Sequence, residues 1–430
     1  MEKVVVVSGS RTAVGAFGGS LKDVAVVDLG AAVIRETLCR AGVRPVPPRD
    51  YADTVPQKLS GRQQVDIEKE CGRYDSSLCE LVIDEVIMGN VLQSGQGQNT
   101  ARQAMIRAGI AKETPAFTIN KVCGSGLKAI ALGAQSIMTG QADVIVAGGQ
   151  ENMSRVPMAL MKGRWGHRME VSGIGEVHDL LVYDALYEIF YGYHMGVTAE
   201  NIARLYQISR EDQDRLALIS HDRALAAIDS GLFNDEIVPV SFMSRNKEVI
   251  VDRDERPMQT SMEKLANLRP VFDRNGSVTA GNASGINDGA AAVLLMSETK
   301  ALELDLKPLA VIEGFASGGL DPAYMGLGPV PAIRRALSLA KMELDDIELI
   351  ELNEAFAAQA IGCMLELGID IEKPNRCGSG ISMGHPVGCT GARQMVTALN
   401  QIEKNGYGTG LISMCIGGGM GMAMVVTNPN

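Results

Sequence analysis

Two reactive side chains of this sequence stand in glycine-rich turns, where a strand pattern gives way to a helical pattern. Cys123 lies in NKVCGSGLKA and His385 lies in MGHPVGCTG. Backbone N–H groups at the start of a helix favour a thiolate, so Cys123 is a candidate nucleophile and His385 its candidate base. A cysteine is more often a small core residue. The flanking glycines and the place at the carboxyl end of a strand favour a reactive thiol, because open α/β sheets bind ligands there.

Two further residues could take part in the same chemistry. Cys415 ends the apolar run LISMC before IGGGMG, and a second cysteine near the first indicates a separate proton-transfer role. Asn353 follows the strand pattern ELIEL. Its amide could donate to an oxyanion or hold a water molecule, or it could only cap the helix that follows.

The remaining histidines and several cysteines carry a weaker signal. His221 falls within a helical pattern beside charged residues, so we expect it to be solvated. The other histidines of the central segment are His167, His178 and His194. Helical patterns contain Cys39, Cys363 and Cys389, which we expect to pack in the interior.

Strand and helix patterns alternate in the first part of the chain. Val4–Val7 is expected to be a buried strand, and residues 23–41 a helix closed by Gly42. EVIMG, AFTIN and DVIVAGG are predicted strands, separated by helices over 100–108 and 124–139. This order predicts an α/β fold whose sheet is mainly parallel and covered by helices.

The alternation stops at Asn152 and resumes near residue 286 with AAAVLLM, LAVIEGFA and ELIELN. In each of the two layered parts a glycine-rich turn leads into a helix, a strand and another glycine turn, which indicates a duplicated fold. We expect an N-terminal half of residues 1–152 plus 286–308. A loop domain of residues 153–285 and a C-terminal half of residues 309–430 complete the expected organisation.

One stretch of the first half departs from this pattern. Arg44–Leu78 is rich in proline and charge and has no sustained apolar period. We interpret it as a surface excursion between a helix and a strand that is dispensable for chemistry.

Composition excludes several classes of protein. The net charge of −11 over 430 residues argues against a basic nucleic-acid surface. Eight cysteines without a CxxC pair indicate neither a zinc site nor a disulfide framework. No apolar run approaches the length of a membrane span, and MEKVVVVSG already begins a strand. We therefore expect a cytoplasmic protein without a metal, a membrane segment or a nucleic-acid partner.

Nine motifs occur in the order found in thiolases, and they cover nearly the whole chain. They are RTAVGAFGGSL, NKVCGSGLKA, AGGQENMS, YHMGVTAENIA, TAGNASGINDGAA, MGLGPVPA, NEAFAAQA, GHPVGCTGA and CIGGGMG. The sequence thus resembles the thiolase family, in particular its biosynthetic, acetoacetyl-CoA type. The resemblance implies a duplicated five-layer α-β-α-β-α fold with an inserted loop domain, and a homodimer or homotetramer with its tetramerisation loop around 155–182.

The resemblance also implies a reaction and a role for each reactive residue. Two acetyl-CoA would condense reversibly to acetoacetyl-CoA and CoA through an acyl-cysteine at Cys123, which His385 activates. Asn353 would hold a water that forms one oxyanion hole with His385. Cys415 would be the acid and base at the α-carbon, and the N–H groups of Cys123 and Gly417 would form the second hole. CoA thioesters are substrates here, and no cofactor is implied.

The family likeness further suggests a coenzyme A pocket. Its candidate residues are Leu186, His194, Met195, Arg256, Phe272, Ala280, Ala283, Ser284, Gly285, Met325 and Phe356. Two departures from the family pattern concern its surroundings. Met258 stands where relatives often place an arginine near the phosphates, with Arg256 two residues earlier, and residues 377–380 read CGSG before the histidine turn.

Other functions are compatible with parts of this pattern. A degradative 3-oxoacyl-CoA thiolase for another short- or medium-chain substrate is the alternative within the family. A β-ketoacyl synthase shares the implied fold but has a different histidine pattern. A nicotinamide-binding protein is suggested by GGGMGM, yet that run precedes an expected final strand rather than a helix. A non-catalytic CoA- or lipid-binding relative is disfavoured by the presence of all four reactive residues.

Overall fold

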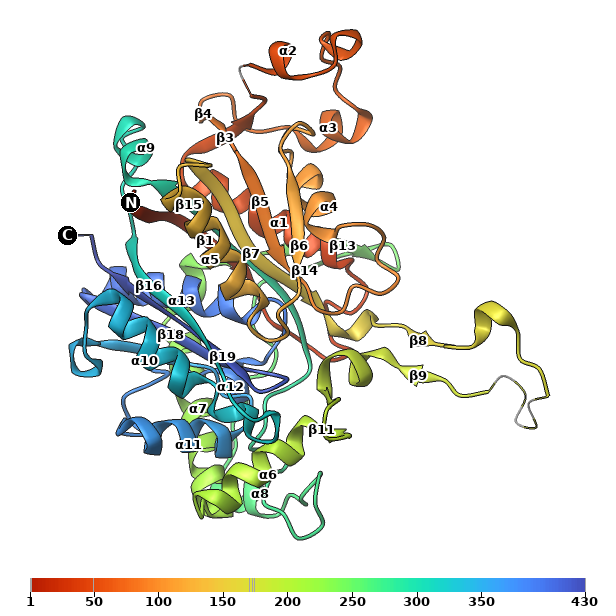
Figure 1. The fold of residues 1–430 in the computed structure, drawn as a ribbon, viewed down its shortest axis with the longest axis vertical. Helices are drawn as coiled ribbons and strands as arrows, with labels where there is room; N and C mark the ends of the chain where they lie inside the picture. Colours follow the sequence, from red (N-terminus) through yellow and green to blue (C-terminus); the bar gives the residue numbers. More distant parts are fainter. Residues whose placement is uncertain (1, 49, 170, 172, 174, 430) are drawn as a thin grey trace.

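The main strands form two half-sheets that share the order and direction of four strands (Figure 1), seen here in a computed structural model that describes residues 2–48, 50–169, 171, 173 and 175–429. The N-terminal order is β6–β5–β7–β15–β1 and the C-terminal order is β17–β18–β19–β16. In the N-terminal half, β1 is antiparallel to β15 and β15 is antiparallel to β7, whereas the outer strands β7, β5 and β6 are parallel. In the C-terminal half, β16 is antiparallel to β19 and β19 is antiparallel to β18, whereas β18 and the outer strand β17 are parallel. The bounds are β1 (Val4–Thr12), β5 (Glu85–Gly89), β6 (Ala116–Ile119), β7 (Val144–Asn152), β15 (Asn287–Ser297), β16 (Ala310–Gly319), β17 (Leu349–Leu352), β18 (Thr409–Ile416) and β19 (Met420–Thr427).

The two half-sheets meet edge to edge through their first strands. Val5 pairs with Val311 and Val6 with Ala310, in antiparallel register. Each half therefore begins with the strand that joins it to the other half. The repeat that the sequence predicted is present in strand order and strand direction.

Helices lie in three layers around the half-sheets. The outer face of the N-terminal half carries α1 (Val26–Arg40) and α4 (Thr100–Arg107). The middle layer holds α5 (Ser125–Met138) and α13 (Thr390–Asn405). The outer face of the C-terminal half carries α10 (Pro329–Ala340) and α11 (Ala357–Leu367). This is the expected five-layer α-β-α-β-α fold.

The alternation of side chains along the buried strands explains the layering. In β1, Val5 and Val7 belong to the apolar core shared with α1 and α4, whereas Val4 and Val6 belong to the core shared with α5 and α13. Successive residues of a strand point to opposite faces, so a run of apolar residues must be covered on both sides. The run VVVV in the sequence therefore calls for a helix layer on each face.

The first helix begins later than the sequence predicted, at Val26 instead of Asp23. The reason lies in a distant residue: Nδ2 of Asn152 donates to the carbonyl oxygens of Leu21 and Val24, at 3.0 and 2.8 Å. With these carbonyls bound, the segment before Val26 is a turn rather than a helix. The helix ends as expected, and Gly42 has a φ of 73°.

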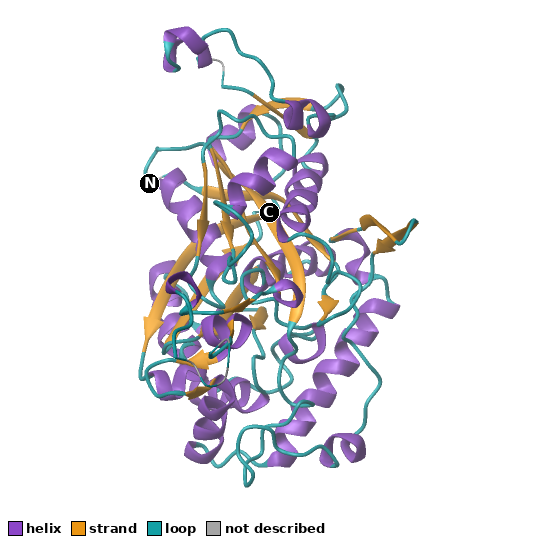
Figure 2. Cartoon of the chain, turned by 90° about the vertical axis from the view of Figure 1, so that its right-hand side faces the viewer, coloured by secondary structure: helices purple, strands orange, loops and turns teal. Residues whose placement is uncertain are grey.

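The excursion is more ordered than its sequence suggested. It is framed by a parallel pair, β3 (Val43–Val46) and β4 (Cys79–Val82), and contains α2 (Tyr51–Thr54) and α3 (Asp66–Cys71). Its tip with α2 projects beyond the body of the molecule (Figures 1 and 2). The part after residue 61 packs, because the carboxylate of buried Glu68 accepts from Arg62, and the hydroxyl of Tyr74 donates to the carbonyl of Ala108 at 2.5 Å.

Most of the remaining elements lie between β7 and β15. The helices α6 (Met195–Leu205), α7 (Arg210–Asp229) and α8 (Met262–Ala266) pack below the body in Figure 1, and a long arm with β8 (Met158–Ala159) and β9 (His178–Asp179) projects to the side. The others are β10 (Tyr187–Glu188), β11 (Tyr193–His194), β12 (Ile237–Val238), β13 (Val240–Ser244) and β14 (Lys247–Val251). Outside this region lie β2 (Gly15–Ala16), α9 (Glu298–Glu303) and α12 (Gly380–Met383).

The expectation that His221 is solvated is wrong. Its side chain in α7 is buried, and its Nδ1 accepts a hydrogen bond from the backbone N–H of Met258 at 3.3 Å. Burial and the charge of Arg256 lower the pKa of His221 to about 4. The charged neighbours that suggested exposure occupy the other side of α7, where Asp222 is exposed.

Within the part of the chain that the structure describes, no helix has both the length and the apolar character of a membrane span.

Candidate active site

Cys123 stands in a strained turn between β6 and α5. The preceding residue, Val122, has a φ of 47°, a left-handed conformation that a β-branched residue seldom adopts. Side chains on both sides hold the turn. Oδ1 of Asn120 accepts from the N–H of Val122 at 2.9 Å, and Oγ of Ser125 donates to the carbonyl of Val122 at 2.6 Å. The conformation that aims the thiol is thus fixed by its neighbours.

Two backbone N–H groups reach the thiol of Cys123. Burial raises the pKa of the thiol to about 11, while hydrogen bonds from the N–H groups of Gly417 and of Cys123 itself oppose that rise. The carboxylate of Glu151 adds a smaller rise. The thiol is therefore protonated in the resting site and needs a base, and the two N–H groups can stabilise negative charge there.

His385 is a buried, neutral imidazole. Its Nδ1 lies 2.6 Å from Oγ1 of Thr390, and this hydroxyl donates to the carbonyl of Pro386 at 3.0 Å. Since the hydroxyl proton is used, we assign the ring proton to Nδ1, which leaves Nε2 as the free acceptor. Nε2 has no hydrogen-bond partner among the described residues. Burial, and then the charge of Arg393, lowers the pKa of His385 to about 3.

Asn353 lies beside the imidazole at the carboxyl end of β17. Its Nδ2 is 3.5 Å from Nδ1 of His385, and its backbone N–H donates to the carbonyl of Ser413 at 2.9 Å. The side chain is buried, and its Oδ1 has no partner among the residues described. An unpaired buried amide oxygen is typical of a site that holds water or substrate.

The turn that carries His385 is seated on β15. The backbone N–H of His385 donates to Oδ1 of Asn287 at 3.1 Å. Gly384 has a φ of 101°, and a Cβ there would lie 2.5 Å from the side chain of Asn287. Only glycine allows this approach.

Cys415 is the penultimate residue of β18, and its side chain is fully buried. Burial raises the pKa of this thiol well above its usual range, and the neighbouring thiol of Cys123 adds to the rise. The chain then turns at Gly417, where a Cβ would lie 2.8 Å from Cε of Met195. The structure therefore brings Cys123, Cys415 and the N–H of Gly417 to one place.

An apolar pocket of about 290 Å³ opens onto His385. Eight of the candidate coenzyme A residues line it: Leu186, His194, Phe272, Ala280, Ala283, Ser284, Gly285 and Phe356. Sequence reasoning missed Met153, Val271, Thr279, Ile286 and Val387, which also line it. Four of them belong to quoted motifs and could have been found there: Met153 in AGGQENMS, Thr279 and Ile286 in TAGNASGINDGAA, and Val387 in GHPVGCTGA. Val271 lies outside the quoted motifs and carries no chemical signal.

The other three candidate residues lie around the pocket. Met195 and Met325 share an apolar cluster with Cys415. Arg256 donates to the carbonyls of Ile381 and Ala283, at 2.7 and 3.0 Å. Its guanidinium therefore holds the loop behind the pocket wall.

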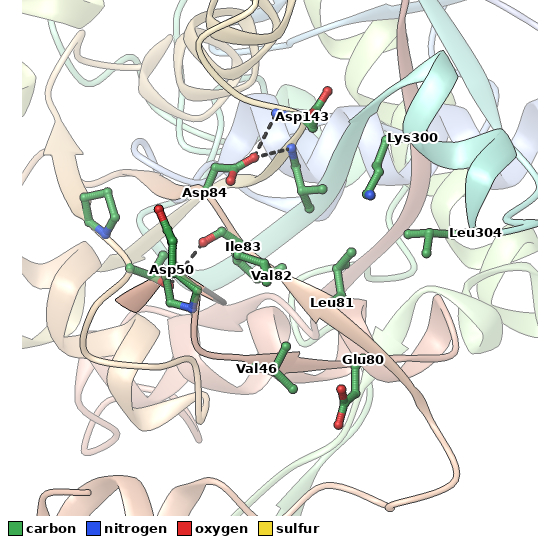
Figure 3. Close-up of a pocket in the computed structure, with 14 residues that line it drawn as sticks. Val46, Asp50, Glu80, Leu81, Val82, Ile83, Asp84, Asp143, Lys300 and Leu304 are labelled. Atoms are coloured by element: carbon green, nitrogen blue, oxygen red, sulfur yellow. Dashed lines mark hydrogen bonds between the residues drawn. The ribbon is translucent and has the colours of Figure 1, made fainter. Parts of the chain in front are cut away.

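A second, larger hollow of about 480 Å³ lies at the root of the excursion (Figure 3). Its wall includes Asp84, which accepts from the N–H groups of Asp143 and Val144 at 2.8 and 2.9 Å. These residues lie at the amino ends of β5 and β7, while the reactive turns lie at the carboxyl ends of the strands. The hollow is separate from the candidate site.

No group of three or more His, Cys, Asp or Glu side chains that could hold a metal ion occurs among the described residues. The chemistry of the site is that of a thiol pair, an imidazole and positioned amide donors.

Comparisons with known proteins agree with this arrangement. The family model "Thiolase, N-terminal domain" matches residues 4–53 and 75–299, and "Thiolase, C-terminal domain" matches residues 306–428. The break at 54–74 falls within the excursion.

Curated relatives match over their full length. The acetyl-CoA acetyltransferase of Syntrophomonas wolfei is 49% identical over 426 residues, covering 99% of this chain and 98% of the relative. An acetyl-CoA acetyltransferase of Escherichia coli is 49% identical over 432 residues, covering 100% of both. The crystal structure of the Bacillus anthracis acetyl-CoA acetyltransferase has a TM-score of 0.88 and 42% identity, covering 100% of this chain and 99% of the other. The chain therefore belongs to the thiolase family.

Proposed function

We propose that this thiolase is an acetyl-CoA C-acetyltransferase, which condenses two acetyl-CoA to acetoacetyl-CoA and CoA and runs the reverse reaction by the same steps. The observation that carries the proposal is the meeting of two thiols at one site: Cys123 with two N–H groups on its sulfur, and Cys415 beside it. Relatives named acetyl-CoA acetyltransferase support it.

The first half-reaction acylates Cys123. Nε2 of His385 takes the thiol proton, and the thiolate attacks the carbonyl carbon of acetyl-CoA. The N–H groups of Cys123 and Gly417, which lie at the sulfur of Cys123, donate to the oxyanion of the tetrahedral intermediate. The carbon–sulfur bond to CoA then breaks. Cys415 gives its proton to the departing CoA thiolate, which leaves acetyl-Cys123 and a Cys415 thiolate.

The second half-reaction forms the carbon–carbon bond. The Cys415 thiolate removes a proton from the methyl group of a second acetyl-CoA. The oxygen of the resulting enolate accepts from His385 and from a water held by Asn353, and its carbon attacks the carbonyl of acetyl-Cys123, whose oxygen lies at the N–H groups of Cys123 and Gly417. Cys123 leaves as a thiolate and recovers its proton from the imidazolium of His385, so both thiols end the cycle protonated.

Burial suits each group to its step. A buried imidazole loses its proton readily, so it returns the proton to Cys123 at the end of the cycle. A buried thiolate at Cys415 is a strong base, as the weakly acidic methyl group of a thioester requires. The small residues Ala280, Ala283 and Gly285 on the pocket wall leave room for a narrow pantetheine arm.

The finer parts of the proposal concern setting and assembly. We place the enzyme in the cytoplasm, in lipid and ketone metabolism, as a homodimer or homotetramer. CoA thioesters are its substrates and it uses no separate cofactor or metal.

Acetylation of Cys123 tests the proposal directly. The protein is incubated with acetoacetyl-CoA and quenched with acid. Intact-protein mass spectrometry should then show one added acetyl group on the parent and none on Cys123→Ala. An acetyl group on the alanine variant contradicts the assignment. In thiolysis, acetoacetyl-CoA should have a higher kcat/KM than longer 3-oxoacyl-CoA substrates, and the opposite order would favour the degradative alternative.

A further inference from the structure

Glu151, at the carboxyl end of β7, is a fully buried carboxylate with only neutral partners. Its Oε2 accepts from the backbone N–H groups of Val91 and Gly388, both at 2.9 Å. Its Oε1 accepts from the N–H of Leu92 at 3.2 Å and from Nδ2 of Asn90 at 2.6 Å. Within the described chain it has no ion-pair partner. Both oxygens are occupied, so this carboxylate is not a free base.

The donors come from both halves of the duplicated fold. Three donors, Asn90, Val91 and Leu92, directly follow β5 of the N-terminal half. Glu151 itself lies near the end of β7 in the same half. Gly388 belongs to the C-terminal half and stands three residues after His385. One carboxylate therefore ties the histidine turn to the half that carries Cys123.

The peptide of Gly388 enters a seat made of glycines. A Cβ at Gly149, Gly89 or Gly126 would lie 2.0, 2.8 or 3.0 Å from the carbonyl oxygen of Gly388. A Cβ on Gly388 itself would lie 2.6 Å from Oε2 of Glu151. A side chain at any of these four glycines would prevent the close approach of the backbones. The carboxylate of Glu151 binds the N–H of Gly388 within this seat.

The seat is adjacent in sequence to both reactive residues. Gly126 stands three residues after Cys123, at the start of α5, and Gly388 stands three residues after His385. A shift of the Gly388 peptide would therefore move the imidazole relative to the thiol. Misplacement of reacting groups by about 1 Å can reduce a rate by about 100-fold.

We propose that Glu151 is a positioning residue: by binding the N–H of Gly388 within the glycine seat, it holds His385 at the distance from Cys123 that proton transfer needs. The inference rests on the proposed roles of Cys123 and His385 and adds the group that sets their spacing across the junction of the two halves. Glu151 touches no reacting atom and acts through the histidine turn.

Glutamine at this position tests the proposal with little change in shape. In one orientation of the amide its NH₂ group faces the N–H groups of Val91 and Gly388, and in the other it faces the N–H of Leu92 and Nδ2 of Asn90, so a donor is placed against two donors in both. We expect Glu151→Gln to lower the kcat of acetoacetyl-CoA thiolysis about 100-fold while KM changes by less than about threefold. Burial raises the pKa of Glu151 to about 7, so assays at pH 8 keep the carboxylate ionised in the parent.

Glu68→Gln is the control remote from the site. Glu68 is also buried, and its carboxylate accepts from the backbone N–H groups of Val65 and Lys112 at 2.9 and 3.1 Å. Unlike Glu151, it also pairs with Arg62 at 2.7 Å. This variant should keep kcat within about twofold of the parent. Equal losses in Glu68→Gln and Glu151→Gln would overturn the proposal, since any buried carboxylate would then serve.

A double-mutant cycle separates positioning from general stability. The readout is alkylation of Cys123 by iodoacetamide, which needs no CoA substrate. His385→Ala should slow alkylation. Glu151→Gln also removes a charge that raises the pKa of Cys123, and this effect is common to both backgrounds. Positioning of His385 therefore predicts that Glu151→Gln slows alkylation in the parent relative to its effect in the His385→Ala background. Equal effects in both backgrounds overturn the proposal. If His385→Ala alone does not change the rate of alkylation, then His385 is not the base of Cys123. That result contradicts the proposed function rather than the role of Glu151.

Glu151→Asp covers the case in which the glutamine variant does not fold. The shorter side chain keeps the charge but cannot reach the donors of both halves. A folded Asp variant that slows alkylation only when His385 is present supports the proposal. A folded Asp variant with the parent's kcat overturns it.

Discussion

At the scale of single residues, the site combines groups whose environments disfavour charge. The thiols of Cys123 and Cys415 are held protonated and the imidazole of His385 is held neutral, each chiefly by burial. A site of this kind carries no charge at rest, and each proton transfer creates a charged pair that positioned donors must stabilise. The two thiols differ in their donors, because two N–H groups reach Cys123.

The two thiols should therefore fail in different half-reactions. A serine at position 415 keeps the size of the side chain, but its hydroxyl has a much higher pKa and cannot serve as the base. We expect Cys415→Ser still to become acetylated at Cys123, yet to lose nearly all condensation and to exchange no solvent deuterium into the methyl group of bound acetyl-CoA. Mass spectrometry measures both. Exchange at the parent's rate would move the role of base to His385.

The neutral imidazole makes a pH-dependent contribution to stability. The folded pKa of His385 is about 3, below the usual value of 6.5, so unfolding takes up a proton at intermediate pH. Above pH 6.5 the imidazole is neutral in both the folded and the unfolded chain, so its titration does not reduce the free energy of unfolding. As pH falls from 6.5 toward 3, the unfolded chain takes up the proton and the free energy of unfolding decreases. The free energy of unfolding in urea should fall between pH 8 and 5 by about 2 kcal/mol more in the parent than in His385→Ala. If the free energy of unfolding has the same pH dependence in the parent and in His385→Ala, the lowered pKa of His385 is contradicted. Other buried groups titrate in both proteins and cancel.

At the scale of elements, the excursion consists of two parts with different roles. Residues 51–60 are mostly exposed and hydrogen-bond within residues 48–60. The following residues are anchored, as the contacts of Glu68 and Tyr74 show. Arg35 lies over the ring of Tyr74, 4.2 Å from its centroid.

Replacement of residues 51–60 by a short Gly/Ser linker should leave the thiolysis kcat within about twofold of the parent, with a similar Tm, because loop changes at the surface are tolerated. Tyr74→Ala is the comparison within the same excursion. It should lower the free energy of unfolding by about 2 kcal/mol through lost packing while kcat per folded enzyme is kept. A large loss of kcat on removal of 51–60 would place this tip at an interface or at the site.

Sequence patterns predicted the elements where the information was local. The apolar runs located the buried strands, and the glycine turns located Cys123 and His385. They failed where a distant residue decides, as at α1, whose start is set by Asn152. Glu151 lies in the quoted motif AGGQENMS, but its role was missed because its donors come from two distant stretches, residues 90–92 and Gly388, that no local pattern connects.

At the scale of the whole molecule, the projecting arm between β7 and α6 exposes large apolar side chains. Large side chains are open to solvent along it: Met158, Leu160, Met161 and Trp165. Such a patch on a projecting arm is typical of an interaction surface. It lies within the region that the family likeness assigned to tetramer formation.

The arm contains the single tryptophan of the chain, Trp165, whose side chain is 86% exposed. If the arm joins copies of the chain, Trp165 becomes buried on assembly. We expect its emission maximum to shift to shorter wavelength in the fraction that light scattering identifies as a tetramer, and to return on dilution. An emission maximum independent of assembly state would exclude the arm from the contact. Trp165→Ala should then weaken the tetramer in sedimentation.

The matching order and direction of strands in the two half-sheets have an evolutionary consequence. In an ancestor made of two identical subunits, the subunits would have met across the strand pair now formed by β1 and β16. Two equal turns would then have faced the symmetry axis. Fusion into one chain released those turns from the need to be identical. In the present chain one turn carries the thiol of Cys123 and the other carries the imidazole of His385. The division of labour between nucleophile and base is thus what a symmetric pair gains when its two genes become one.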